Sequence, residues 1–251
     1  MAQANPVLTR LDETARVQRQ VLGAGPAAMS VDDVVLRTVA LLLLTGVVAA
    51  FSWIFVPQQA WIGGSLFGAG LGAVLLALLI SIRGSTNPVV IAVYAVLQGV
   101  LLGVTSRAFE LVYPGIVIQA VTGTFAVFLG MALLYRARVI RATPRLARFV
   151  AGTLIGLLVL GAVNLLAYLF GGAQLLEVYS LTGRVGWLPY VFSGVAVMAG
   201  ALTFILDFDA VERGVADGLP RRYAWYCAFG VLVGLIYLYW QILRLLSYLR
   251  R

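Results

Sequence analysis

Seven apolar stretches follow one another along the chain, and each is about as long as a helix that crosses a bilayer. Such a helix needs about 20 mostly apolar residues. Short polar or arginine-bearing segments separate the stretches. The pattern predicts an all-α fold, a polytopic membrane protein in which residues 33–251 form a seven-transmembrane helix bundle, with spans at about 35–56, 61–82, 88–106, 114–135, 147–170, 187–206 and 224–246.

The first 32 residues have a different character from the rest of the chain. They are polar, carry charges of both signs, and contain Gly and Pro at 23–26. A segment with so few apolar residues cannot bury enough surface to offset the entropy lost on ordering. We therefore expect residues 1–32 to form a mobile cytoplasmic N-terminal tail.

Composition supports a membrane location. Hydrophobic residues make up 62% of the chain and charged residues 11%, whereas soluble domains average roughly 45–50% and about 25%. The lipid bilayer is therefore the first expected partner. The net charge of +8 comes from arginines placed between the apolar runs, so it indicates membrane orientation, and we expect no nucleic-acid partner.

The arginines fall mostly on one side of the predicted membrane. Cytoplasmic segments of membrane proteins carry an excess of basic residues. This bias predicts a cytoplasmic N-terminus in a multi-pass protein of the cell inner (plasma) membrane. All 18 basic residues are arginine, which suggests a bacterial source. The arginines on the predicted cytoplasmic side are Arg10, Arg16, Arg19, Arg37, Arg83, Arg136, Arg138, Arg141, Arg145, Arg148, Arg213, Arg221 and Arg222; the others are Arg107, Arg184, Arg244, Arg250 and Arg251.

Two absences limit the chemistry that this chain can perform. It has no histidine and a single cysteine, Cys227. Nucleophilic catalysis by Ser–His or Cys–His pairs is excluded, as are histidine-ligated metals and disulfides within the chain. We expect the protein not to be an enzyme and to hold no small-molecule cofactor.

Glycines at every fourth position predict close helix packing. Gly64, Gly68 and Gly72 have this spacing in the second predicted span, and Gly99 and Gly103 have it in the third. Small residues on one helix face allow two backbones to approach closely, which matters in lipid because no hydrophobic effect drives helices together there.

A few polar side chains lie inside or near the ends of the spans. Amides within membrane helices most often bridge neighbouring helices. Arg107 and Glu110 have the i, i+3 spacing of a local ion pair. The polar candidates for a pore or a helix interface are Gln98, Gln241 and Arg244, and the further amides are Gln119 and Asn164.

Asp207 and Asp209 stand where the sixth span ends. Two residues apart on a helix, they face opposite directions. Asp209 is spaced to pair with Arg213, but Asp207 has Ala210 and Val211 at i+3 and i+4. Loss of water favours the protonated form of a carboxyl group, and carboxylate oxygens suit hard cations such as calcium. Asp207 is therefore a candidate for a proton-sensitive ligand of a cation such as calcium, and Asp209 is a second ion-binding candidate.

Together with these acids, four long stretches give the chain a family resemblance. It resembles the Bax inhibitor-1/YccA-like (TMBIM) family of seven-helix membrane proteins, in its bacterial branch. The resemblance runs from NPVLTRL at residues 5–11 to the C-terminus, and its strongest stretches are YAVLQGVLLGVTSRAFE (94–110), YPGIVIQAVTGTFAVFLGMALLYRARVIRATPRL (113–146), LDFDAVERG (206–214) and YAWYCAFGVLVGLIYLYWQILRLL (223–246).

The resemblance implies six helices around a central seventh, and a pH-sensitive calcium leak closed by a latch between acids on the last two helices. Asp207 matches the latch acid of the sixth helix. The matching position on the seventh helix falls near Gly234, and Gln98 stands where many relatives carry Glu. The two-carboxylate latch therefore cannot form in this chain as it does in the family.

Three classes of function remain open from the sequence. The first is a calcium leak channel with Asp207 at its cytoplasmic gate. The second is a non-conducting membrane regulator that binds other membrane proteins, such as a protease or stress machinery, with the arginines of residues 136–148 as a contact surface for a protein partner or anionic lipid. The third, an intramembrane hydrolase, would need an aspartate pair, and Asp207 and Asp209 face apart.

Overall fold

The computed structural model describes residues 28–56, 65–171 and 187–250. Within these residues the chain forms seven helices, and its only β-pairing is an isolated bridge between Ala28 and Pro220. The prediction of an all-α bundle is confirmed. The helices are α2 (Val31–Phe55), α3 (Ser65–Arg83), α4 (Pro88–Val112), α5 (Ile116–Arg136), α6 (Pro144–Gly171), α7 (Trp187–Ala216) and α8 (Tyr223–Leu249).

The helices have the length and surface of a polytopic membrane protein. Among the described residues, six helices, all except α3, are long and apolar enough to cross a membrane. Large apolar side chains point outward from them, including Leu36 at 68% exposure and Leu158 at 72%. Such an outer surface is stable in lipid, where apolar side chains need no cover.

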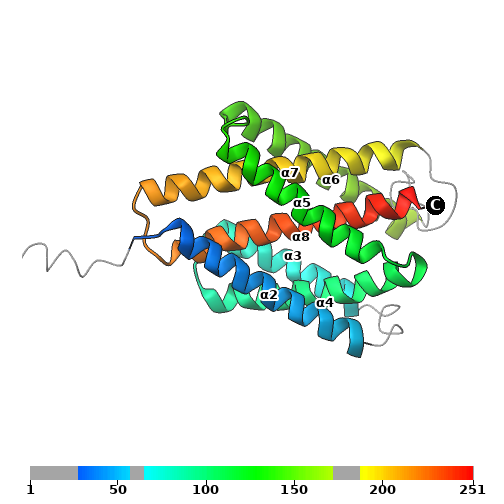
Figure 1. The fold of residues 1–251 in the computed structure, drawn as a ribbon. Coiled ribbons are helices and arrows are strands. Elements are labelled where there is room, and N and C mark those ends of the chain that lie inside the picture. Colours follow the sequence, from blue (N-terminus) through cyan, green and yellow to red (C-terminus); the bar gives the residue numbers. More distant parts are fainter. Residues whose placement is uncertain (1–27, 57–64, 172–186, 251) are drawn as a thin grey trace, which may run out of the picture.

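Helix α8 lies at the centre of the bundle, as the resemblance implied. Figure 1 shows it running through the middle, with α2, α3 and α4 on one side, α6 and α7 on the other, and α5 crossing it at an angle. Leu235 and Leu238 pack into one apolar cluster with α5 and α7, while Leu232 and Ile236 pack into another with α2 and α4. Other helices therefore cover α8 on both sides, which places it in the interior of the bundle.

The two ends of the bundle are distinguished by which helices begin and finish there. Helices α2 and α8 begin at the end where α7 finishes, which we call the Ser30 end, and α8 finishes at the opposite end (Figure 1). Helix α7 continues unbroken past the predicted end of its span at 206 as far as Ala216. Asp207 and Asp209 therefore lie on regular helix close to the Ser30 end.

The start of α2 differs from the predicted boundary of the tail at residue 32. Ser30 caps the helix, and its side chain accepts a hydrogen bond from the Asp33 N–H while Asp33 accepts one from the Ser30 N–H. This capping box satisfies two backbone donors at the helix start. Met29 is only 2% exposed, and its N–H donates to the Leu219 carbonyl at 2.8 Å. The rest of the predicted tail, 1–27, lies outside the described residues.

The third span packs against the first through its glycines. A Cβ added at Gly103 would overlap the backbone of Ala49, and one at Gly99 would lie 2.8 Å from the Thr45 carbonyl oxygen. Hydroxyl groups follow the same contact, since Ser52 Oγ donates to the Val100 carbonyl at 3.0 Å. Gly99 and Gly103 thus allow α2 and α4 to lie backbone to backbone.

The glycines of the second span are arranged differently where the structure describes them. A Cβ added at Gly72 would meet no atom within 4 Å. Gly72 therefore provides no close approach inside the chain. Gly68 lies in α3, where the surroundings of residues 65–69 are not described, and Gly64 lies outside the described residues.

Candidate functional site

Asp207 lines a cavity near the Ser30 end of the bundle. The cavity has a volume of about 430 Å³ and is bounded by α3, α6, α7 and α8 through residues such as Ser81, Leu154, Cys227 and Tyr237. In the part of the chain that the structure describes, Asp207 has no hydrogen bond and no ion pair. A carboxylate in such a place is costly in a membrane protein and marks a candidate functional site.

The α8 residue that faces Asp207 is Gly230, one turn before the expected Gly234. A Cβ added at Gly230 would lie 3.8 Å from Asp207 Oδ1, whereas one at Gly234 would lie 2.9 Å from the ring of Phe204. Neither position carries an acid. Asp207 is thus the only carboxylate lining this cavity among the described residues.

Asp209 faces away from Asp207, as the helical spacing predicted. It lines a second, larger cavity between α2, α5 and α7, and its carboxylate forms the predicted ion pair with Arg213. Glu212, one turn along, accepts a 2.6 Å hydrogen bond from the Tyr135 hydroxyl on α5. The two aspartates therefore belong to separate sites.

The other polar candidates lie away from the Asp207 cavity. Gln98 donates from Nε2 to the Tyr94 hydroxyl, one turn earlier on the same helix, at 3.2 Å. The Gln241 Oε1 atom is buried and has no hydrogen-bond partner among the described residues. Arg244 Nε donates to the Tyr248 hydroxyl at 2.8 Å. Arg244 is 14 residues beyond Gly230, roughly 21 Å along α8, so it lies toward the far end of the bundle.

Arg107 and Glu110 do not form the local pair that their spacing suggested. Arg107 donates to the carbonyl of Trp53 at 2.8 Å, at the C-terminal end of α2. Glu110 accepts hydrogen bonds from the N–H groups of Gly115 and Val117, at the start of α5. Helix ends leave unpaired carbonyls at one terminus and N–H groups at the other, so each side chain caps a different helix instead.

Of the two amides expected to bridge helices, Gln119 does so. Its Oε1 accepts a 2.8 Å hydrogen bond from Arg250, just beyond α8. Asn164 is buried on α6, at 3% exposure.

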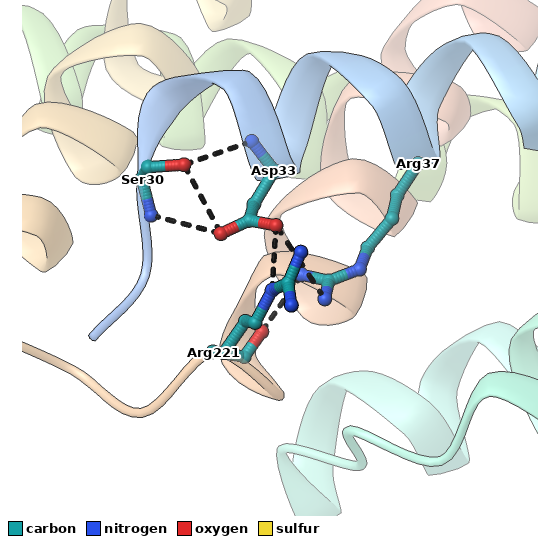
Figure 2. A network of polar contacts seen from close by, with 4 residues as sticks. All are labelled: Ser30, Asp33, Arg37 and Arg221. Carbon is teal, nitrogen blue, oxygen red and sulfur yellow. Dashed lines mark hydrogen bonds and ion pairs between the residues drawn. The ribbon is translucent and has the colours of Figure 1, made fainter. Parts of the chain in front are cut away.

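A polar network that the sequence did not reveal joins the start of α2 to the connection between α7 and α8. Asp33 Oδ1 accepts a 2.7 Å hydrogen bond from Arg221 Nε and lies 3.9 Å from Arg37 (Figure 2). Arg37 in turn donates to the Arg221 carbonyl at 2.7 Å and lies over the Trp225 ring. The one local signal was Ser30 followed three residues later by an acid, which is the pattern of a capping box.

The described residues contain no cluster of three or more His, Cys, Asp or Glu side chains that could hold a metal ion. A resident calcium needs six to eight oxygen ligands. The Asp207 cavity presents a single carboxylate among the described residues.

Comparison with known proteins supports the family assignment over nearly the whole chain. The family described as Bax inhibitor 1 like matches residues 5–251, which include all seven helices and the Asp207 cavity. No curated protein matches the chain. The match confirms the resemblance found in the sequence, and this multi-pass membrane protein belongs to the Bax inhibitor 1-like family.

Proposed function

We propose that this protein is a pH-sensitive leak for cations, with calcium as the transported ion and Asp207 as the carboxylate at its gate. The Ser30 end of the bundle faces the cytoplasm of a bacterial cell, in the inner membrane. The distribution of the arginines supports this orientation, because most of them lie in segments at this end.

The observation that carries the proposal is the unpaired state of Asp207. Its carboxylate lines a cavity of about 430 Å³ at the Ser30 end and is not neutralised by a neighbouring cation among the described residues. An ionised carboxylate gives the cavity a negative charge that attracts cations, and uptake of a proton removes that charge. The same group therefore supplies both cation binding and pH sensitivity.

Calcium flux into liposomes that contain the purified protein tests this function. We expect flux to depend on pH in the native protein and to lose that dependence in Asp207→Asn, which keeps the shape of the side chain. Asp209→Asn is the matched control, because Asp209 faces the other cavity and pairs with Arg213. Unchanged flux and pH dependence in Asp207→Asn would reject Asp207 as the gate.

A second function is favoured by Gly230. With glycine opposite Asp207, the cavity holds one carboxylate and no latch between acids. The protein would then regulate other membrane proteins and conduct nothing. Two results together would establish this alternative. Liposomes that contain the protein show no flux at any pH, and a membrane protein co-purifies with it in stoichiometric amount. That partner is lost when the arginines of residues 136–148 are neutralised.

A further inference from the structure

A second cavity, larger than the Asp207 cavity, lies on the opposite side of the bundle. It has a volume of about 990 Å³ and lies between α2 and α5, with α7 and α8 behind it. Its volume is in the upper part of the range of roughly 300–1,000 Å³ that is typical of sites for small molecules.

The walls of this cavity are apolar and open toward the lipid. Val39 on α2 and Leu129 on α5 line it and remain 46% and 58% exposed. Phe128 and Leu42 form deeper parts of the lining. In a protein that spans the membrane, this opening gives an acyl chain of the surrounding bilayer direct access to the cavity.

The edge of the cavity at the Ser30 end carries an excess of positive charge among the described residues. Arg136, Arg138 and Arg141 line this edge, are exposed, and make no ion pair with any described residue. Of the two acids on the same lining, Asp209 is paired with Arg213, and Glu212 accepts a hydrogen bond from the Tyr135 hydroxyl and keeps its charge. Three arginines therefore face one unpaired carboxylate on this lining.

The backbone at this edge has an unusual conformation. Arg138 has φ of 57°, the only positive φ of a non-glycine residue in the described part of the chain. Residues other than glycine rarely adopt this conformation, and such outliers concentrate at binding sites. Arg136, Arg138 and Arg141 all lie on or beside this turn, and all three line the cavity.

We infer that this cavity binds one anionic phospholipid from the leaflet at the Ser30 end. One acyl chain lies in the apolar groove between α2 and α5, and the phosphate contacts Arg136, Arg138 and Arg141. Guanidinium groups match phosphate oxygens in charge and in hydrogen-bond geometry, and the apolar walls match the chain. The inference does not depend on whether the protein conducts ions.

Native mass spectrometry of the full-length protein, equilibrated with phosphatidylglycerol or phosphatidylcholine of the same acyl chains, tests the site. We expect one retained phosphatidylglycerol and much weaker retention of phosphatidylcholine. Each basic residue near an anionic lipid contributes about fivefold in affinity, so the triple variant R136Q/R138Q/R141Q should lose on the order of a hundredfold. The control R145Q/R148Q neutralises exposed arginines that do not line the cavity and should retain the lipid.

A second variant tests the groove apart from the charge. Leu129→Trp fills the groove and leaves all three arginines in place, so it should also lose the lipid. Glycerol phosphate, which has the headgroup chemistry without chains, should not displace it. Variants are compared only when they fold and elute from a size-exclusion column as the native protein does. If the triple variant does not fold, the single variant R138Q replaces it.

Four outcomes would overturn the inference. They are equal retention of both lipids by the native protein, equal loss in the R145Q/R148Q control, full retention in Leu129→Trp, and displacement by glycerol phosphate. A bound polypeptide in place of lipid in the same spectra would assign the groove to a protein segment instead.

Discussion

Asp33 and Arg221 are 188 residues apart in the chain, yet Arg221 Nε lies 2.7 Å from Asp33 Oδ1. Their contact joins the first turn of α2 to the connection between α7 and α8. Backbone contacts beside it join the same two segments: the Met29 N–H donates to the Leu219 carbonyl, and Ala28 forms a β-bridge with Pro220. The start of α2 is thus attached to the helical pair α7 and α8, which carries Asp207.

Loss of the Arg221 side chain should loosen this attachment. In Arg221→Gln we expect hydrogen–deuterium exchange to become several-fold faster at residues 28–34 and 216–223, because local opening there no longer breaks a charged hydrogen bond. Arg222→Gln is the control, since the neighbouring Arg222 is also exposed but lies over the Tyr223 ring instead. Unchanged exchange in Arg221→Gln would mean that the backbone contacts and Arg37 hold the segment without the Arg221 side chain.

Arg107 and Glu110 should act independently, although their spacing is that of an ion pair. Arg107 caps α2 and Glu110 caps α5, and each charged hydrogen bond contributes about 1.5–3 kcal/mol to stability. A double-mutant cycle with Arg107→Gln and Glu110→Gln should therefore give a coupling free energy within about 0.5 kcal/mol of zero. The free energies of unfolding of the native protein, the two single variants and the double variant, measured in a denaturing detergent, give this coupling. A coupling free energy well above that value would show that Arg107 and Glu110 interact with each other and would contradict the separate caps.

Gly103 should not tolerate a methyl group, because α2 and α4 are in backbone contact there. We expect Gly103→Ala to lower the free energy of unfolding by about 1–3 kcal/mol, the usual cost of overpacking. Gly72→Ala is the matched control, since its added Cβ meets no atom; there the gain in helix propensity of about 1 kcal/mol should dominate. Equal stability of the two variants would contradict the close approach of α2 and α4.

The sequence was sufficient for the architecture because the apolar stretches are long and separated. Their length alone predicts helices that cross a bilayer, and the family resemblance added the central position of α8. Local spacing also predicted the Asp209–Arg213 pair and the opposite faces of Asp207 and Asp209. These relationships depend only on the geometry of one helix.

Contacts between helices were less accessible to sequence reasoning. The partner position of Asp207 is Gly230 instead of Gly234, because the register of α7 against α8 depends on the turn between them and on their packing. Arg107 and Glu110 pair with helix ends, which an i, i+3 spacing does not represent. The contact of Asp33 with Arg221 links distant parts of the chain, and only the fold brings them together.

Placing an acid at Gly230 should give the Asp207 cavity the second carboxylate that it lacks. In Gly230→Asp the two carboxylates face each other, and two such groups at close range cannot both remain ionised at a pH where one alone would. One proton is then held up to a higher pH. If Asp207 is the gate, the pH at which calcium flux changes in liposomes should move upward relative to the native protein.

Gly230→Asn is the matched control for that substitution, because it adds a side chain of nearly the same shape at the same position without the charge. A general loss of packing at Gly230 would show in this variant as well. A shift in the pH response that occurs in Gly230→Asp and not in Gly230→Asn would identify the second carboxylate beside Asp207 as its cause. The same pH response in Gly230→Asp and in the native protein would contradict a gate at Asp207, because a second carboxylate beside the sensing group cannot leave its protonation unchanged.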